Sequence, residues 1–130
     1  MKILYSDDIE FLRKGVCADL ESHEGVTAIA CNLELQETLR MVERESPDVL
    51  LLDVLNETDI NAGIRIAEAL QKTEHRKNGK MKILLLTIFR GDDKAIIDAL
   101  DKGLADGIVT KPTTTDGIIR EVRRVVRGWD

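Results

Sequence analysis

Four apolar stretches of this 130-residue sequence each end on polar side chains that can do chemistry. The polar residues are Asp7 and Asp8 after residues 2–6, Asp53 after residues 49–52, Thr87 after residues 81–86 and Lys111 after residues 107–110. A carboxylate can act as a nucleophile or hold a divalent cation, a hydroxyl can donate a hydrogen bond, and an ammonium group can bind anionic oxygens. If the fold brings these groups together, they are suited to metal-assisted chemistry on an anionic group.

The central stretch, residues 49–52, is a continuous run of one valine and three leucines that is entered through Pro47. Such a run predicts a strand buried on both faces, as in a parallel sheet covered by helices. Asp53 then lies at the carboxyl end of its strand, where open α/β sheets collect ligands. A simpler alternative is that Asp53 only opens a turn or caps the following helix. Further strands are predicted over residues 2–6, 26–31, 81–87 and 107–110.

Five segments have the apolar periodicity of helices. They are residues 9–21, 33–45, 62–72, 92–102 and 115–127. The helical spacing of Ile9, Leu12, Val16 and Leu20 predicts that they share the apolar side of the first helix, which Asp8 is placed to cap. Asn32 is expected to cap the second helix. The last helix is expected to bury Val126 and to show its four arginines to the outside, and residues 74–80 are expected to form a solvated connection.

Five strands that alternate with five helices imply an α/β fold with a five-stranded parallel sheet and helices on both faces. The usual strand order for this count is 2-1-3-4-5. In that order the switch point lies between the first and third strands, beside the strand ends that carry Asp7, Asp8 and Asp53. The fold therefore predicts that all four polar strand ends meet at one edge of the sheet.

Carboxylates gathered in this way need a counter-cation. Two of them about 4 Å apart repel by roughly 4 kcal/mol at an effective dielectric near 20. Lys111 supplies one positive charge, and Mg²⁺ held by oxygen ligands would supply the rest. Asp53 is then a candidate carboxylate nucleophile for a phosphoryl group.

At these residues the chain resembles the receiver domain of two-component response regulators, a family with a flavodoxin-like, CheY-like fold. The likeness covers essentially the whole chain. It consists of the acidic pair after the first strand, the aspartate after the third, the threonine after the fourth and Lys111-Pro112 after the fifth.

The resemblance implies that Asp53 accepts a phosphoryl group from a histidine kinase or a phosphotransfer protein. It also implies a Mg²⁺ site formed by Asp53, by Asp8 and by Asp7, the last partly through water. The backbone carbonyl of Leu55 would be a further ligand. The chain would then be a signalling switch that changes its surface to control an output, and not an enzyme in its own right.

The resemblance also assigns Lys111 to the phosphoryl oxygens and makes Thr87 the switch residue that hydrogen-bonds one of them. The Lys111-Pro112 bond resembles the cis bond of the family, a minority state even before proline. The output domain or effector is not encoded in these residues. The arginines of the last helix are either a solvated surface or a contact of a homodimer. In the second case they would pair with Asp98 and Asp101 of another copy.

Several positions depart from the family pattern. The Met-Pro pair usual after the acceptor is absent, and Gly63 comes about two residues later than expected. Ile88 stands where a small residue is usual, and Ile108 stands where an aromatic residue is usual. These departures keep open a degenerate receiver that works as a constitutive interaction module. An Asp-nucleophile phosphohydrolase is disfavoured, because Leu55 replaces the second aspartate of the DxD pattern of those enzymes.

Three bulky apolar residues follow the acceptor and the switch threonine. They are Leu55, Ile88 and Phe89. None of them can hydrogen-bond a water in line with the phosphorus, and positioning of that water matters in phosphoryl transfer. We therefore expect slow loading from small phosphodonors and slow hydrolysis of the phosphoaspartate, unless these side chains point into the loop packing.

Composition narrows the class of protein. Hydrophobic residues make up 43% and charged residues 33% of the chain, which suits one globular domain over residues 1–130. A net charge of −5 argues against direct nucleic-acid binding. No apolar run is long enough to span a membrane, and the first residues lack the pattern of a signal peptide, so we expect a cytoplasmic protein. Cys17 and Cys31 lack metal-site spacing and are expected to be reduced thiols inside the fold.

Overall fold

The computed structural model describes residues 1–54, 61–87, 93–110 and 114–127. Within them, strands and helices alternate along the chain, except that two helices follow one another between the third and fourth strands. The strands are β1 (Lys2–Asp7), β2 (Thr27–Asn32), β3 (Val49–Asp53), β4 (Lys82–Thr87) and β5 (Gly107–Thr110). The helices are α1 (Glu10–Glu21), α2 (Leu35–Glu45), α3 (Ala62–Leu70), α4 (Glu74–Lys77), α5 (Lys94–Asp101) and α6 (Thr115–Arg127).

The five strands form one parallel sheet in the order β2-β1-β3-β4-β5, which confirms the predicted fold class and topology. The register places Ser6 beside Leu52 in the pair β1–β3. In the next pairs, Asp53 lies beside Leu86 and Thr87 lies beside Thr110. The carboxyl ends of the four neighbouring strands β1, β3, β4 and β5 therefore meet at one edge.

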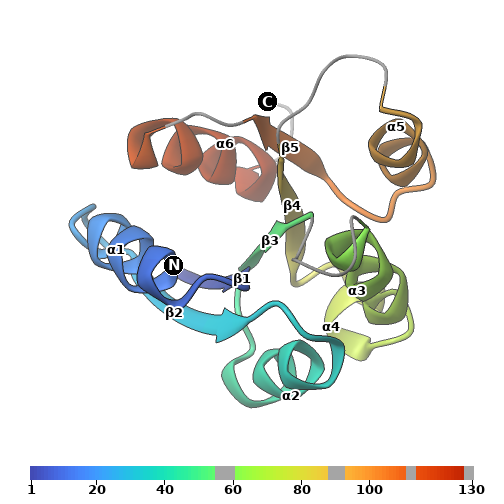
Figure 1. The fold of residues 1–130 in the computed structure, drawn as a ribbon, viewed down its shortest axis with the longest axis horizontal. Coiled ribbons are helices and arrows are strands. Elements are labelled where there is room, and N and C mark those ends of the chain that lie inside the picture. The colour runs from blue at the N-terminus through green and yellow to red at the C-terminus, as the bar shows by residue number, and fades with distance from the viewer. Residues whose placement is uncertain (55–60, 88–92, 111–113, 128–130) are drawn as a thin grey trace.

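Helices cover both faces of the sheet, as Figure 1 shows. Because side chains alternate along a strand, each strand contributes to two apolar cores. Ile3, Tyr5 and Leu51 belong to the core under α1 and α6. The neighbouring residues Leu4 and Leu50 belong to the core under α2, α3 and α5. Residues 49–52 have no exposed surface, as the continuous apolar run predicts for a strand covered on both sides.

The apolar side of the first helix is exposed where the helix starts. Ile9 is 48% exposed and Leu12 is 41% exposed, and the buried residues of α1 are Cys17 and Leu20. The helix begins directly after the carboxyl end of β1, so its first turn lies at the sheet edge and only its later turns cover the sheet. Asp8 does not cap it either, because Ile9 is the N-cap residue and makes no side-chain capping bond.

Two further local predictions are wrong. The cap of α2 is Glu34, whose carboxylate accepts the N–H of Glu37 at 2.6 Å, and not Asn32, which ends β2. In α6, Val126 is 43% exposed, while Arg124 is only partly exposed and pairs with Glu121. The amphipathic pattern predicts the position of α6 correctly, but it does not predict the exposure of Val126, which lies at the border of the buried face.

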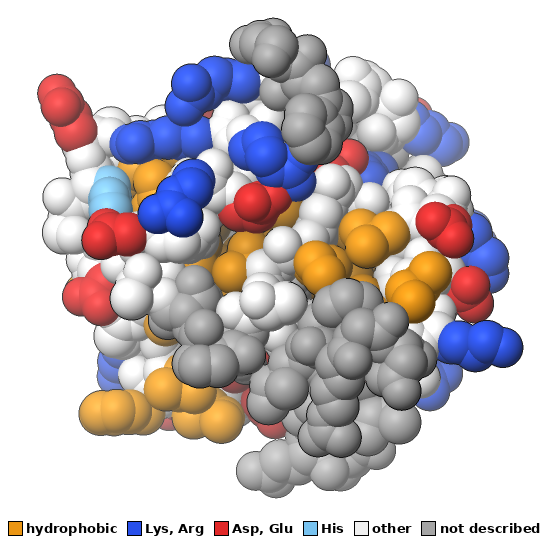
Figure 2. All heavy atoms as spheres, turned by 90° about the horizontal axis from the view of Figure 1, so that it is seen from above, with side chains coloured by type: hydrophobic (Ala, Val, Ile, Leu, Met, Phe, Trp, Pro, Cys, Tyr) orange, Lys and Arg blue, Asp and Glu red, His pale blue; other side chains and the backbone are white. Residues whose placement is uncertain are grey.

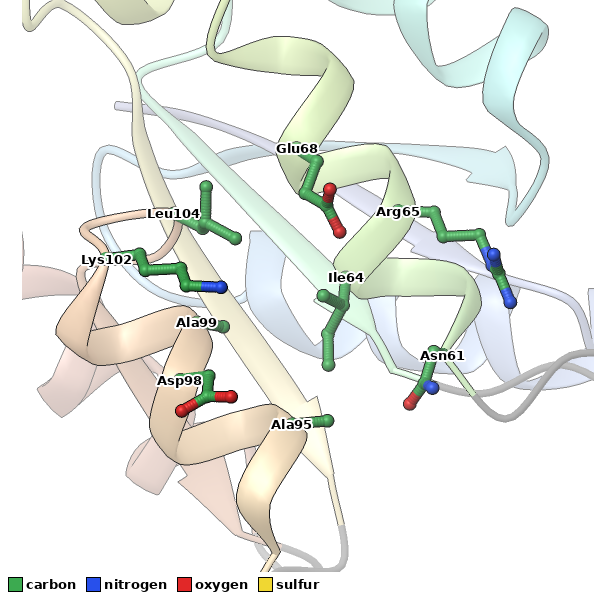
Figure 3. Close-up of a pocket in the computed structure, with 9 residues that line it drawn as sticks. All are labelled: Asn61, Ile64, Arg65, Glu68, Ala95, Asp98, Ala99, Lys102 and Leu104. Atoms are coloured by element: carbon green, nitrogen blue, oxygen red, sulfur yellow. The ribbon is translucent and has the colours of Figure 1, made fainter.

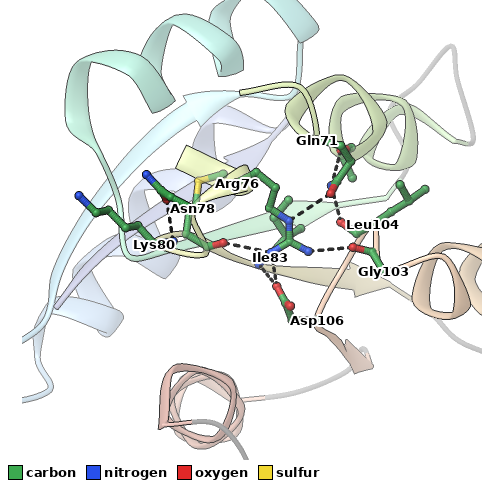
Figure 4. A network of polar contacts seen from close by, with 10 residues as sticks. Gln71, Arg76, Asn78, Lys80, Ile83, Gly103, Leu104 and Asp106 are labelled. Carbon is green, nitrogen blue, oxygen red and sulfur yellow. Dashed lines mark hydrogen bonds and ion pairs between the residues drawn. The ribbon is translucent and has the colours of Figure 1, made fainter. Parts of the chain in front are cut away.

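Residues 74–80 are more than a connection, because they contain the short helix α4. Arg76 of this helix donates to the carbonyl oxygens of Met81 at 3.0 Å and Gly103 at 3.0 Å, and to the carboxylate of Asp106 at 2.6 Å. Figure 4 shows this network, in which Asp106 also accepts the N–H of Ile83. The network ties α4 to the amino ends of β4 and β5, at the edge opposite the predicted site.

Among the residues that the structure describes, no helix is long and apolar enough to cross a membrane. Both cysteines, Cys17 and Cys31, are buried free thiols, as predicted. Burial raises the pKa of Cys17 to about 11, so this thiol stays protonated at neutral pH.

Candidate functional site

An acidic cluster, defined here as Asp7, Asp8 and Asp53, lies at the carboxyl ends of β1 and β3. One carboxylate oxygen from each residue lies within 4.8 Å of the others. Asp7 and Asp53 are buried, and Asp8 is partly exposed. The predicted strand order brings these carboxylates together because β1 and β3 are neighbours in the sheet. The simpler interpretation of Asp53 as an isolated turn residue therefore does not describe this arrangement.

Asp7 is held in place on both of its carboxylate oxygens. Its Oδ1 accepts the backbone N–H of Ile9 at 3.0 Å, and its Oδ2 accepts the hydroxyl of Tyr5. The guanidinium of Arg13 donates to the backbone oxygen of Asp7 at 2.7 Å. The first turn of α1 and the strand itself thus fix the position of this carboxylate.

Tyr5 is a contact of the cluster that the sequence analysis missed. The side chain is buried, and burial raises its pKa well above the usual range, with a further rise from the hydrogen bond to Asp7 and the charges of Asp7 and Asp53. The hydroxyl therefore stays protonated and acts as the donor. A signal was present in the sequence, because residues two apart on a strand point to the same face and Tyr5 lies two before Asp7.

Gly63 lets the start of α3 approach the end of β3 at backbone distance. Its N–H donates to the carbonyl oxygen of Val54 at 2.7 Å. A Cβ at this position would lie 2.2 Å from the carbonyl oxygen of Asp53 and 2.9 Å from the Cα of Val54. A side chain of any size would therefore displace α3 or the end of β3.

Thr87 ends β4 and is buried. It directly follows Leu86, the residue paired with Asp53, and the carbonyl oxygen of Leu86 accepts the N–H of Val54 at 3.2 Å. Thr87 thus lies next to the strand end that carries the acidic cluster. Lys111 follows Thr110, the neighbour of Thr87 in β5. Four predicted positions, Leu55, Ile88, Phe89 and Lys111 with its Pro112 bond, lie outside the described residues.

The donor set of the acidic cluster fits a hard divalent cation. All three side chains offer carboxylate oxygens, and none offers nitrogen or sulfur. Oxygen ligands are the set that Mg²⁺ prefers, and one or two carboxylates with water are its usual protein ligands. Asp8 is the most open of the three and is accessible from solvent.

Two other surfaces are separate from the acidic cluster. A hollow of about 330 Å³ lies between α3 and α5, and Figure 3 shows Ile64 pointing from α3 toward Ala95 and Ala99 of α5. A second hollow of about 360 Å³ lies beside α6, and its lining residues are His23, Asp116, Ile119, Arg120, Arg123 and Arg127. On the face that Figure 2 shows, Lys and Arg side chains gather at the upper left, and others lie along the right edge. Neither hollow contains a residue of the cluster.

The known proteins that this chain is similar to include response regulators. The response regulator protein VraR of Staphylococcus aureus is 29% identical over 128 residues, which are 98% of this chain and 57% of that protein. The chain thus spans little more than half the length of this relative.

Two solved structures share the fold. The chemotaxis response regulator CheY4 of Vibrio cholerae has a TM-score of 0.77 at 23% identity, with 95% of this chain and 97% of that chain covered. The receiver domain of the Francisella response regulator 1452 has a TM-score of 0.75 at 22% identity, with 97% and 96% covered.

The family profile described as the response regulator receiver domain matches residues 3–123, from the middle of β1 into α6. The matched range includes the residues of the acidic cluster, the buried Thr87 and Gly63, where α3 contacts the end of β3. The chain therefore belongs to the response regulator receiver domain family.

Proposed function

We propose that this receiver domain is a phosphorylation-controlled switch in which Asp53 accepts a phosphoryl group from a histidine kinase or a phosphotransfer protein. The observation that carries the proposal is the acidic cluster. It places Asp53 at the end of a fully buried strand, with Asp7 and Asp8 beside it. A receiver needs this arrangement because the acceptor must be fixed while the donor approaches.

In the transfer step, a carboxylate oxygen of Asp53 attacks the phosphorus of a phosphohistidine. The new oxygen–phosphorus bond forms as the nitrogen–phosphorus bond breaks, and the imidazole nitrogen keeps the electron pair of the broken bond. The chain contributes mainly position and charge to this step, as in other phosphoryl transfers. The product is an acyl phosphate on Asp53.

Asp8 and Asp53, with Asp7 partly through water, would hold Mg²⁺ together with the backbone carbonyl of Leu55. When bound, the ion offsets the charge of the carboxylates and of the incoming phosphoryl oxygens. Lys111 would contact the same oxygens with its ammonium group. Without such cations the acidic cluster would repel an anionic donor.

Thr87 would convert phosphorylation into a conformational change. The phosphoryl group adds roughly −1.5 to −2 charge and strong acceptor oxygens. If Thr87 and Lys111 each gain a charge-assisted hydrogen bond of about 1.5 to 3 kcal/mol, together they gain about 3 to 6 kcal/mol. Turning a 1:99 equilibrium into 99:1 takes about 5.5 kcal/mol, so the two contacts are of the required size.

The proposed partners follow from the same arrangement. Beside the acidic cluster, the N-cap residue Ile9 is exposed, and so are Phe11 and Leu12 in the first turn of α1, with Phe11 at 84%. Exposed apolar side chains of this kind are typical of surfaces that partner proteins cover, and here the partner would be the phosphodonor. The output would be an effector or an attached domain in the cytoplasm, with pairing of two copies as an additional route.

A phosphoryl mimic tests the switch directly. Beryllofluoride and Mg²⁺ added to the ¹⁵N-labelled protein should shift amide signals in β4, β5 and α5 as well as around Asp53, and Asp53→Asn should abolish the shifts. A constitutive interaction module, for which Ile108 in place of the family aromatic is the supporting observation, would show no such response. Absence of all shifts in the wild type would therefore overturn the proposed switch.

A further inference from the structure

Tyr5 is a buried polar side chain that lies directly beneath the acidic cluster. Its ring is buried in the core under α1 and α6, together with Cys17 and Leu86. Its hydroxyl donates to Oδ2 of Asp7, while the other oxygen of Asp7 is held by the N–H of Ile9. The side chain of Tyr5, two residues before Asp7 in β1, thus contacts the acidic cluster through its hydroxyl.

These contacts restrict how Asp7 can present its oxygens. A carboxylate with one fixed donor on each oxygen cannot rotate without breaking a hydrogen bond in a buried place. A preorganised carboxylate loses less freedom when it binds an ion or an ion-bound water.

We propose that Tyr5 is a positioning residue that sets the cation affinity of the acidic cluster by acting through Asp7. The inference rests on the proposed function, because it concerns the cation that phosphorylation requires. Tyr5 itself would not touch the cation. Loss of an outer hydrogen-bond partner of a metal ligand typically weakens metal binding roughly 10- to 100-fold, and we expect roughly a tenfold loss here.

The test compares Mg²⁺ dissociation constants, measured by titration calorimetry on the unphosphorylated protein. Tyr5→Phe keeps the ring and removes only the hydroxyl, so weaker binding would report on the hydrogen bond. Ser6→Ala is the matched control, since Ser6 is the next residue of β1, is fully buried and bonds to Thr38 and Asn32 on the other face. This control should bind Mg²⁺ as the wild type does.

A double-mutant cycle with Asp7→Asn decides whether Tyr5 acts through Asp7. The effect of Tyr5→Phe should disappear when Asp7 is already Asn, because the hydroxyl then has no carboxylate to position. An equal loss in both backgrounds would overturn the inference, as would wild-type affinity in Tyr5→Phe or an equal loss in Ser6→Ala.

A spectroscopic measurement keeps the inference testable even if Tyr5→Phe does not fold. Tyr5 is the only tyrosine of the chain and Trp129 is the only tryptophan, so Trp129→Phe leaves Tyr5 as the main near-ultraviolet chromophore. Mg²⁺ should perturb the Tyr5 absorption band in this background and leave it unchanged when Asp7→Asn is added. Mg²⁺ binding with no change in the band overturns the role of Tyr5, whereas absence of Mg²⁺ binding in the wild type overturns the proposed metal site itself.

Discussion

At the scale of single residues, Thr87 carries the proposed link between chemistry and conformation. Thr87→Ala should accept a phosphoryl group nearly as well as the wild type, because Asp53 and the acidic cluster are untouched. With only the Lys111 contact left, phosphorylation would shift the conformational equilibrium by about 1.5 to 3 kcal/mol, or roughly tenfold to a hundredfold. The NMR shifts induced by phosphorylation should therefore be smaller, and an unchanged shift pattern would refute the coupling role of Thr87.

The apolar residues after Asp53 and Thr87 should control the lifetime of the phosphoryl group. Ile88→Ala should speed loading from a small phosphodonor by opening the pocket. The double substitution Leu55→Asn, Phe89→Glu should speed decay after donor removal, because both new side chains can orient an attacking water. If phosphoryl loading and phosphoaspartate decay are no faster in these variants than in the wild type, then the three side chains do not occlude the acceptor.

Residue types at the strand ends, together with the predicted strand order, are sufficient to predict the acidic cluster, but they do not predict the contact of Tyr5. Asp7, Asp8 and Asp53 are polar residues at the ends of apolar runs, which makes them visible in a sequence. Tyr5 lies inside such a run and fits a strand by its propensity alone. Its hydroxyl matters only because alternation along the strand places Tyr5 on the same face as Asp7, and residue type alone does not draw attention to that pair.

At the scale of elements, the approach of α3 to β3 depends on the lack of a side chain at residue 63. Gly63→Ala should destabilise the fold by about 1 to 3 kcal/mol, because the new Cβ overlaps the backbone at Asp53. It should also slow phosphorylation, since either α3 or the acceptor strand must move. Urea unfolding and phosphodonor labelling measure the two effects.

Gly15→Ala is the matched control for this prediction. Gly15 lies in the middle of α1 and is exposed, and apart from its chain neighbours and the backbone of its own helix a methyl group added there would meet no atom within 4 Å. The same substitution should there stabilise the helix by about 0.5 to 1 kcal/mol. Equal effects of the two substitutions on stability would show that the close approach at Gly63 is not required.

Short elements and helix ends are the features that the sequence does not predict. The helix α4 spans four residues, too few for a 3.6-residue period to appear, so the sequence of residues 74–80 indicates only a solvated connection. The exposure of Ile9 and Leu12 depends on where α1 starts relative to the sheet edge, and that is a property of the tertiary structure. Periodicity in a sequence predicts which side of a helix is apolar, but it does not predict which part of that side other elements cover.

The Arg76 network gives α4 a structural role that can be separated from the chemistry. Arg76→Ala removes donors from two backbone carbonyls and leaves Asp106 without its ion-pair partner, so we expect a loss of about 2 to 3 kcal/mol in the free energy of unfolding. Phosphorylation of the folded fraction should be retained, because the network lies at the opposite edge of the sheet. Lys77→Ala, an exposed change in the same helix, should leave stability unchanged.

At the scale of the whole molecule, the alternation of strands and helices is enough to predict the sheet order. Right-handed crossovers with helices on both faces leave few topologies for this element order, and the observed one places β1 and β3 side by side. The acidic cluster follows from that adjacency. What the topology does not provide is the composition of the exposed surface of α1 and α6, because core packing does not determine which residues lie there.

The proposed switch requires that Asp53 accepts one phosphoryl group in a Mg²⁺-dependent reaction. Intact-mass spectrometry after incubation with acetyl phosphate tests it most directly, with wild type and Asp53→Asn compared in the presence of Mg²⁺ or a chelator. We expect a mass increase of one phosphoryl group in the wild type with Mg²⁺ only, and none in Asp53→Asn. Stable, Mg²⁺-dependent label on Asp53→Asn, or a wild type that takes up none, would contradict it.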